Sequence, residues 1–189
     1  MRDAIDWLKE NGGMEGKEWM IAGHSVGGTM ALMLSLQARE QEGDMKWGKE
    51  GAMEGLKGVI SIEGIFDFVA LRDAHLEYRE IYDAFTTGAF GSEEDGCWER
   101  GNVLRGRRKV REGIMVVLVV HSREDELVEW EQAEQMVQRL EEEKGKRDGV
   151  GVLMEVNGKH QEIVTEGVVI GKVVDQALRM LIKRGKGES

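Results

Sequence analysis

The chain has 189 residues, of which 41% are apolar and 33% are charged, and this is enough to build one domain around a sizeable core. The formal net charge of −10 argues against general nucleic-acid binding, because an acidic surface repels phosphate groups. No apolar run is long enough to span a membrane, the N-terminus lacks the apolar core of a signal peptide, and the single cysteine, Cys97, excludes an internal disulfide, so we expect a cytoplasmic protein.

The first half of the sequence alternates between helical and strand-like segments. Gly12 and Gly13 follow the first helical segment, where glycine commonly ends a helix. The elements expected here are a helix over residues 3–11, a strand over 19–22, a helix over 29–42, a strand over 56–62, a polar and aromatic helical stretch over 69–85, and a loop over 88–111. Cys97 falls in this loop, and a buried, unreactive thiol is the favoured interpretation.

The second half carries the strongest strand, over residues 114–120, because an apolar run rich in valine suits a parallel strand buried on both faces. A charged amphipathic helix over 126–144, a strand over 150–156 and a last helix over 164–183 complete the chain. Alternating strands and helices predict an α/β fold with a mostly parallel sheet and helices on both faces. In such sheets the reactive residues gather on loops at the carboxyl ends of the strands.

Ser25 is the central residue of a Gly-x-Ser-x-Gly motif that runs from Gly23 to Gly27, between a predicted strand and a predicted helix. In this context the motif predicts a nucleophile elbow, a sharp turn that exposes the serine hydroxyl. We expect both glycines to be required, because a Cβ two residues before or after the serine would meet neighbouring backbone. A glycine-rich turn without chemistry, serving helix packing or anion binding, is the alternative.

An acid and a base for this serine follow later strands in the expected order. Asp125 comes a few residues after the strand over 114–120, and His160 comes just after the strand over 150–156. A serine needs a base to take its proton, and histidine does so near neutral pH while a carboxylate fixes its tautomer. We therefore predict Ser25, Asp125 and His160 as catalytic residues, with the backbone N–H of Val26 as an oxyanion donor.

Several alternatives to these assignments remain open. Asp125 also suits the cap of the following helix, and Glu124 and Glu126 flank it with the same chemistry. His121 ends a strand and is a rival base. The other two histidines are His75, expected at the surface or beside the substrate, and His24, which belongs to the elbow and whose ring we expect to point away from the hydroxyl.

Five segments spread over most of the chain match one known family: Gly-His-Ser-Val-Gly-Gly at 23–28, Glu-Gly-Ile-Phe-Asp-Phe at 63–68, Leu-Arg-Asp-Ala-His at 71–75, His-Ser-Arg-Glu-Asp-Glu-Leu-Val at 121–128 and Gly-Lys-His-Gln at 158–161. With these segments the sequence resembles the α/β-hydrolase superfamily and, within it, the fungal type of kynurenine formamidase (arylformamidase). It implies the three-layer hydrolase fold in one domain over residues 1–189, with a helical and loop insertion around 66–112.

The resemblance also implies hydrolysis of N-formyl-L-kynurenine to kynurenine and formate, in tryptophan catabolism, by a serine hydrolase without metal or cofactor. Ser25 would be the nucleophile, Asp125 the acid and His160 the base. The expected partner is a small aryl amide or ester, with no nucleic acid or membrane, and a homodimer is left open. The aromatic side chains expected either to line an aryl pocket or to pack on the sheet are Phe66, Phe68, Tyr78, Tyr82 and Phe85.

One departure from this family concerns the oxyanion hole. The family's His-Gly-Gly-x-Trp motif has no counterpart in the sequence, and the first strands of the fold are missing before the elbow. A truncated chain and a reduced homologue both account for this, and either is expected to be less active and less soluble than a longer form. The rival functions are a carboxylesterase of the hormone-sensitive-lipase type and a non-catalytic homologue.

Overall fold

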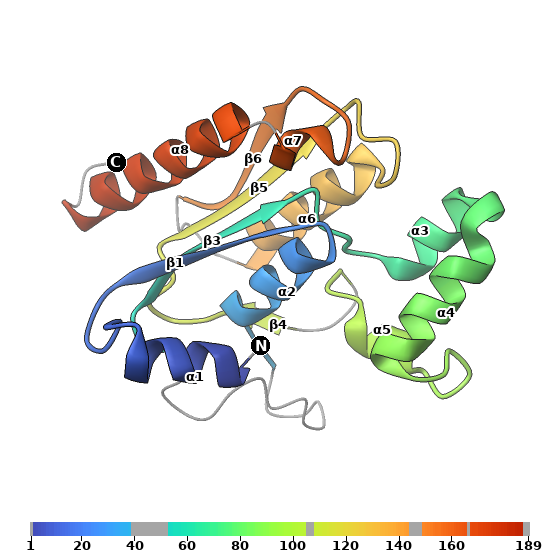
Figure 1. Ribbon diagram of the computed structural model, residues 1–189, viewed down its shortest axis with the longest axis horizontal. Coiled ribbons are helices and arrows are strands. Elements are labelled where there is room, and N and C mark those ends of the chain that lie inside the picture. Colours follow the sequence, from blue (N-terminus) through green and yellow to red (C-terminus); the bar gives the residue numbers. More distant parts are fainter. Residues whose placement is uncertain (1, 39–52, 105–107, 144–148, 166, 187–189) are drawn as a thin grey trace.

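The protein is built on a parallel sheet of four strands, as the sequence predicts (Figure 1). The computed structural model describes residues 2–38, 53–104, 108–143, 149–165 and 167–186. The strands of the sheet lie side by side in the order β1 (Trp19–His24), β3 (Leu56–Ile62), β5 (Val116–Ser122) and β6 (Val150–Val156). All three neighbouring pairs are parallel, so the four carboxyl ends meet at one edge.

Helices cover both faces of the sheet and give three layers. One face packs against α1 (Arg2–Asn11), α2 (Val26–Ser35) and α6 (Trp130–Glu143), and the other against α7 (Glu162–Thr165) and α8 (Gly167–Gly185). Figure 1 shows α8 on the opposite side of the sheet from α1 and α2. The predicted three-layer fold is thereby confirmed.

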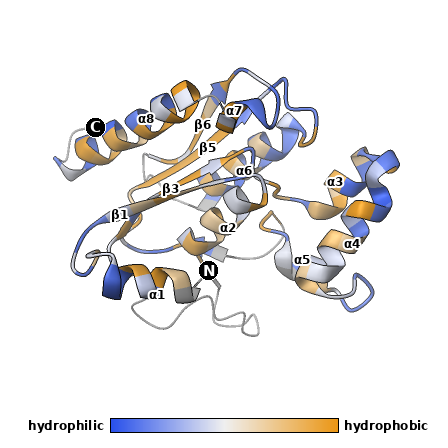
Figure 2. Cartoon of the chain, viewed as in Figure 1, coloured by the Kyte–Doolittle hydropathy of each residue, from blue (hydrophilic) through white to orange (hydrophobic). Residues whose placement is uncertain are grey.

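The central strands bury both of their faces, which accounts for their apolar sequences. Along β5 every residue is buried, and alternate side chains join opposite cores: Val117 and Val119 pack on the side of α2 and α6, whereas Leu118 and Val120 pack on the side of α8. Strand β5 is hydrophobic over most of its length, while α1 and α6 carry both hydrophobic and hydrophilic residues (Figure 2). Burial on both sides is what the valine-rich run of 114–120 predicted.

The helix predicted over 29–42 is shorter than expected. It ends at Ser35, and β2 (Leu36–Ala38) pairs antiparallel with β4 (Arg108–Val110), while the predicted residues 39–42 lie outside the described part of the chain. Arg111 binds the end of the helix, because its backbone N–H donates to the Ser35 carbonyl and its Nε to the Leu34 carbonyl. These contacts come from a distant segment, so local periodicity could not reveal them.

Residues 68–101 form a helical lobe beside the carboxyl edge of the sheet rather than a helix followed by a loop. It contains α3 (Phe68–Ala74), a 3-10 turn (Leu76–Tyr78), α4 (Arg79–Phe90) and α5 (Cys97–Gly101). The buried Arg72 joins these elements, since its guanidinium pairs with Asp73, Asp83 and Glu93 and stacks over Trp98. The thiol of Cys97 is buried, as expected.

Other predicted boundaries differ less, although α6 begins at Trp130 rather than at residue 126, and the strand predicted over 114–120 spans Val116–Ser122. The strands over 56–62 and 150–156 have the predicted ends, and α1 extends the helix of 3–11 by one residue. The last helix is divided into α7 and α8, and residue 144, the predicted end of the helix before β6, lies outside the described residues. None of the helices in the described part of the chain has the length and apolar character that a membrane span requires.

Candidate active site

The carboxyl edge of the sheet brings together four polar residues, one after each strand. Ser25 directly follows β1, Glu63 directly follows β3, Asp125 lies on the loop after β5, and His160 lies on the loop after β6. Two backbone hydrogen bonds continue the sheet into this edge: Ser25 N–H donates to the Ile62 carbonyl at 2.8 Å, and Glu63 N–H donates to the Val120 carbonyl at 2.8 Å. The sheet itself therefore fixes where these residues lie.

Ser25 has the strained backbone of an elbow, with φ 55° and ψ −128°. The glycines that the turn requires differ in part from those that the motif predicted. A Cβ on Gly23 would lie 2.0 Å from the Gly27 carbonyl oxygen, so that position excludes a side chain. A Cβ on Gly27 would meet nothing within 4 Å, so the prediction for Gly27 is wrong. Gly28 is the second restricted position, because its Cβ would lie 2.8 Å from Ser61 Oγ.

Asp125 uses its two carboxylate oxygens for two tasks. Oδ1 accepts hydrogen bonds from the backbone N–H groups of Leu127 and Val128, at 2.9 and 3.0 Å. Oδ2 accepts one from His160 Nδ1 at 2.8 Å. Asp125 therefore does not cap the following helix, as one alternative predicted, because these N–H groups lie on the loop ahead of α6; its contact with His160 is the one that a catalytic triad requires. The side chain of Asp125 is fully buried.

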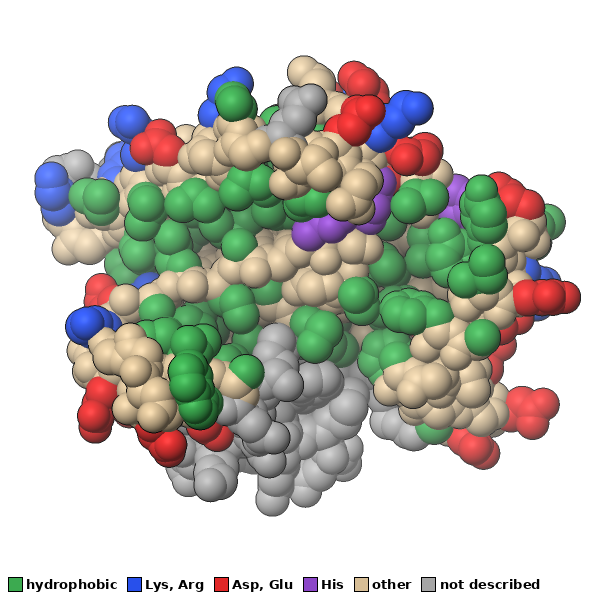
Figure 3. Space-filling model, in the orientation of Figure 1, with side chains coloured by type: hydrophobic (Ala, Val, Ile, Leu, Met, Phe, Trp, Pro, Cys, Tyr) green, Lys and Arg blue, Asp and Glu red, His purple; other side chains and the backbone are tan. Residues whose placement is uncertain are grey.

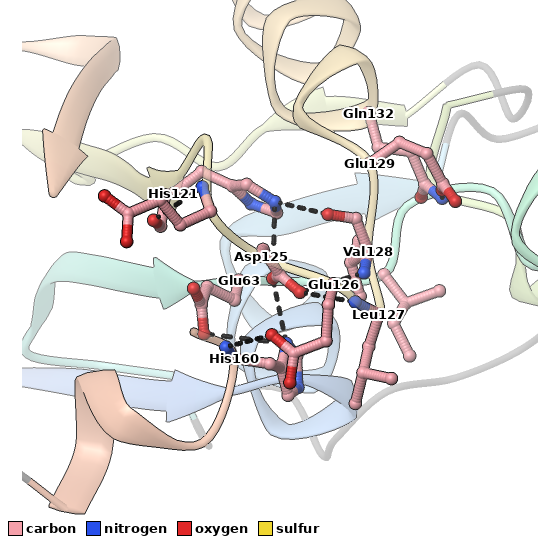
Figure 4. A network of polar contacts seen from close by, with 12 residues as sticks. Glu63, His121, Asp125, Glu126, Leu127, Val128, Glu129, Gln132 and His160 are labelled. Carbon is pink, nitrogen blue, oxygen red and sulfur yellow. Dashed lines mark hydrogen bonds and ion pairs between the residues drawn. The ribbon is translucent and has the colours of Figure 1, made fainter. Parts of the chain in front are cut away.

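His160 is held by three hydrogen bonds from two other segments, the loop after β5 and the end of β1 (Figure 4). Its Nδ1–H donates to Asp125, its backbone N–H donates to Glu126 Oε2 at 3.1 Å, and its carbonyl oxygen lies 2.9 Å from His24 Nε2. Because Nδ1 carries the proton that binds Asp125, Nε2 is the basic nitrogen of the neutral ring. The side chain of His160 is 6% exposed, so its orientation is closely fixed.

The contact between Asp125 and His160 shifts both pKa values. Burial alone would raise the pKa of the Asp125 carboxyl, but hydrogen bonds from His160 and from two backbone N–H groups outweigh burial and lower it. Burial alone would lower the pKa of His160, but the hydrogen bond and charge of Asp125, with smaller contributions from Glu63 and Glu126, raise it above its ordinary value of 6.5. The pair therefore favours the ionised acid and the protonated base.

Glu63 is a second buried carboxyl group beside the same histidine, and sequence reasoning did not identify it as a site residue. Its side chain is 0% exposed, and its Oε2 lies 3.1 Å from His24 Nε2 and 3.5 Å from His160 Nδ1. Burial raises its pKa, and the hydrogen bond from His24 only partly offsets this. The sequence signal that could have identified Glu63 is its position directly after a buried strand.

His121, the rival base, lies deeper than His160. It is completely buried, and its Nε2 lies 2.9 Å from the Val128 carbonyl and 3.5 Å from Asp125 Oδ2. A carbonyl oxygen can only accept, so Nε2 carries the proton. Figure 4 shows Asp125 between the rings of His121 and His160. His121 thus holds the loop that carries Asp125 and does not reach the surface.

Hydrophobic side chains extend from the elbow toward the helical lobe. A small cluster of buried residues from α3 and the loop before α6 packs with Val26, Leu127, Tyr82 and Phe90, all partly buried. His75 lies nearby, 17% exposed, with its Nε2 2.7 Å from Glu129. Figure 3 shows histidine side chains at two places on this face with hydrophobic side chains between them. An apolar substrate group would therefore find hydrophobic contacts beside the elbow.

The predicted aromatic pocket does not form from all of its members. Phe66 and Phe68 are buried within two different clusters, whereas Tyr78 and Phe85 are exposed by 43% and 39%. Of the five predicted side chains, Tyr82 is the partly buried one that packs against the same cluster as Val26. The alternative prediction, a helix packing on the sheet, does not account for the two buried phenylalanines: Phe66 lies on the loop before α3, and Phe68 packs in a cluster that contains no strand residue.

Three side chains of the site have the spacing of metal ligands. One ligand atom each from His24, Glu63 and His160 lies within 4.8 Å of the others. His24 Nε2, however, faces a carbonyl oxygen and a carboxylate oxygen, so it carries a proton in this arrangement and offers no lone pair. The geometry is explained by hydrogen bonds alone.

Comparisons with known proteins now bear on this site. The sequence matches the BD-FAE family over residues 1–140, which include the elbow, Glu63 and Asp125. The chain belongs to the BD-FAE family. No curated protein matches the sequence. The residue range of the match stops before His160, so the base comes from the structure and the sequence pattern rather than from the family match.

Solved structures of esterases share the fold of this BD-FAE chain. Esterase B from Lactobacillus rhamnosis is 12% identical, with 98% of this chain and 62% of that chain covered and a TM-score of 0.67. A truncated carbohydrate esterase from gut microbiota is 15% identical (96% and 67% covered, TM-score 0.65), and an esterase from Pyrococcus furiosus is 17% identical (95% and 58% covered, TM-score 0.54). These likenesses show the α/β-hydrolase fold.

The BD-FAE chain spans about three fifths of the length of the Pyrococcus furiosus esterase. In the described part of the chain, β1 pairs with β3 alone and stands at the edge of the sheet. Ser25 therefore follows an outer strand of the described sheet. These findings confirm the resemblance at the level of the α/β-hydrolase superfamily and do not show kynurenine formamidase specifically.

Proposed function

We propose that this chain carries the catalytic residues of a serine esterase, with Ser25 as nucleophile, His160 as base and Asp125 as acid. The observation that carries the proposal is the 2.8 Å contact between Asp125 Oδ2 and His160 Nδ1, formed at the same edge of the sheet as a serine in a strained turn. Strained non-glycine residues cluster at functional sites. Membership of the BD-FAE family and the esterase fold support the same reaction class.

The mechanism follows from the orientation of His160. With Nδ1–H bound to Asp125, Nε2 takes the proton of the Ser25 hydroxyl as its oxygen attacks the ester carbonyl. The imidazolium returns that proton to the leaving alcohol, and water then releases the acid from the acyl-enzyme by the same steps. The buried carboxylate of Asp125 stabilises the imidazolium each time it forms.

The oxyanion donor on this chain is the backbone N–H of Val26. It lies in the first turn of α2, where N–H groups lack an intrahelical acceptor and the helix dipole favours negative charge. Two further N–H groups of this turn, those of Gly28 and Thr29, already bind the Ser25 carbonyl. A second donor belongs to the motif that the sequence lacks, and loss of one donor costs roughly 10²–10³ in rate.

Labelling with a fluorophosphonate probe tests this proposal. The purified chain is expected to form a covalent adduct on Ser25, located by peptide mass spectrometry, and to hydrolyse p-nitrophenyl acetate. The variant Ser25→Ala should lose both signals while it keeps the circular dichroism spectrum of the parent. An unlabelled parent chain, under conditions in which another serine hydrolase is labelled, contradicts the proposal and favours a non-catalytic homologue.

Hydrolysis of N-formyl-L-kynurenine is the second candidate, and the partly buried Tyr82 and Phe90 near Val26 favour an aryl group at this site. The comparisons support the esterase reading more strongly, since the similar structures are esterases. Measuring kcat/KM for N-formylkynurenine and for p-nitrophenyl esters on the same preparation separates the two. A preference for the formamide supports kynurenine formamidase activity, and a preference for the esters supports the main proposal.

A further inference from the structure

The buried carboxyl group of Glu63 and its backbone conformation each make the folded state less stable, and packing alone explains neither feature. Its carboxyl group is fully buried, and transferring a charge out of water is unfavourable unless partners compensate. Its backbone has φ 47°, in the left-handed region, and the only other described non-glycine residue with a positive φ is Ser25. The two strained residues directly follow β1 and β3, which are neighbouring strands.

The carboxylate of Glu63 orients the ring of His24, the residue before the proposed nucleophile. His24 Nε2 lies 3.1 Å from Glu63 Oε2 and 2.9 Å from the His160 carbonyl oxygen, so one N–H is shared between two acceptors. The rings of His24 and His160 are also in contact, with centroids 4.5 Å apart. Glu63 thus fixes the ring that holds the main chain of His160.

The same carboxylate stands beside the side chain of His160. Its Oε2 lies 3.5 Å from Nδ1, while Asp125 Oδ2 lies 2.8 Å from the same atom. Four titratable groups face Glu63 in all: His24 on β1, His121 on β5, Asp125 on the loop after β5, and His160 on the loop after β6. Two carboxylates therefore surround the nitrogen that becomes part of an imidazolium during the reaction.

We propose that Glu63 is a positioning residue for His160, acting through His24 on the main chain and through its own charge on the ring. This inference rests on the proposed function, in which His160 is the base. Asp125 keeps the primary contact and sets the tautomer, and Glu63 adds negative charge at longer range. Its removal therefore weakens the base without abolishing it.

The variant Glu63→Gln tests this, because glutamine keeps the size and one oxygen acceptor but removes the charge. We expect kcat/KM for p-nitrophenyl acetate to fall by roughly 10–100-fold, as for other groups that orient a functional histidine. The acid limb of the pH profile of kcat/KM should move to lower pH, because a carboxylate that favours the imidazolium is gone. Asp175→Asn, which removes a carboxylate from the exposed face of α8, is the matched control.

Active sites are counted in each preparation with the fluorophosphonate probe, so that misfolded protein does not enter the rates. A purely structural Glu63 would lower the number of active sites and leave the acid limb in place. An acid limb that does not move in Glu63→Gln overturns the inference, whatever happens to the rate. If the parent chain is not labelled at all, the proposed function fails, and this inference fails with it.

Discussion

Nδ1 of His160 lies 2.8 Å from Oδ2 of Asp125, and the other oxygen of that carboxylate holds the backbone N–H groups of the residues that follow. One aspartate therefore fixes both the histidine and the loop on which the aspartate stands. Substitutions at this position separate the two tasks, because asparagine retains an oxygen for the loop but presents no charge to the ring.

Asp125→Asn is expected to fold normally and to lose about 10⁴ in kcat, because the imidazole loses its tautomer control and the imidazolium loses its stabilising charge. Thermal unfolding should change little, since Oδ1 of asparagine still accepts from Leu127 and Val128. Asp125→Ala is the comparison: it should lose both activity and loop stability. Equal thermal stability of the two variants would show that the loop does not depend on this side chain.

The pH profile of kcat/KM is predicted from the raised pKa of His160. The base must be neutral to act, so activity should rise with pH through a midpoint above 6.5. Stability should change in the opposite direction. A histidine with a raised pKa in the folded state contributes stability that is fully present below its unfolded pKa and is lost as pH rises through the folded value.

The measurement is a series of initial rates with p-nitrophenyl acetate, together with urea midpoints, across the same buffers. A midpoint of activity at or below 6.5 contradicts the assignment of His160 as a base held by Asp125. Asp125→Asn should move the midpoint to lower pH, since the largest charge that favours the imidazolium is then absent.

The elbow glycines give a matched pair of substitutions. Gly28→Ala is expected to destabilise the fold by about 1–3 kcal/mol, because its Cβ would press on Ser61 Oγ and approach two carbonyl oxygens in a packed interior. Gly27→Ala should be neutral or stabilising by up to about 1 kcal/mol, because its Cβ meets open space in a helix. Urea denaturation measures both, and equal effects would contradict the close packing of α2 against β3.

Arg72 gives a prediction for the helical lobe. Arg72→Met should destabilise the protein by about 1–3 kcal/mol and increase proteolysis within residues 68–101, since three carboxylates lose their shared cation but regain water. Arg79→Met is the control, because Arg79 is exposed and, among the described residues, its ion pair is with Asp83 at 3.7 Å. The effect of this substitution should stay within about 0.5 kcal/mol. Equal protease sensitivity of the two variants would contradict a central role for Arg72.

The parts of the fold that could be predicted from the sequence are those with local signals. Strands β3 and β6 were predicted to the residue, because apolar runs bounded by polar or glycine residues have clear ends. The pairing of β2 with β4 was missed, since nothing within residues 36–38 indicates a partner that lies at residues 108–110. The packing of residues 68–101 into a lobe was missed as well, and two of the three carboxylates that Arg72 joins there, Asp83 and Glu93, are distant from it in sequence.

The candidate site divides in the same way. Asp125 and His160 were found because each follows a strand, and strands of a parallel sheet end at one edge. Glu63 follows a strand too, but it belongs to the site because its carboxylate lies close to His24 and His160. These distances are set by the packing of the sheet and cannot be read from the sequence. The contact between Glu126 and the backbone of His160 has no sequence signal, because a glutamate beside a triad acid is ordinarily a solvated residue.

The residues of the proposed site are divided between the outer and the inner strands of the sheet. Within the described sheet, Ser25 and His160 follow the two outer strands, β1 and β6, whereas Glu63 and Asp125 follow the two inner strands. Outer strands are held by one neighbour and detach at lower free energy than inner ones. The two groups proposed to exchange a proton therefore follow the outer strands of the sheet, and mild heating is expected to abolish the proposed activity while the inner strands that precede Glu63 and Asp125 are still folded.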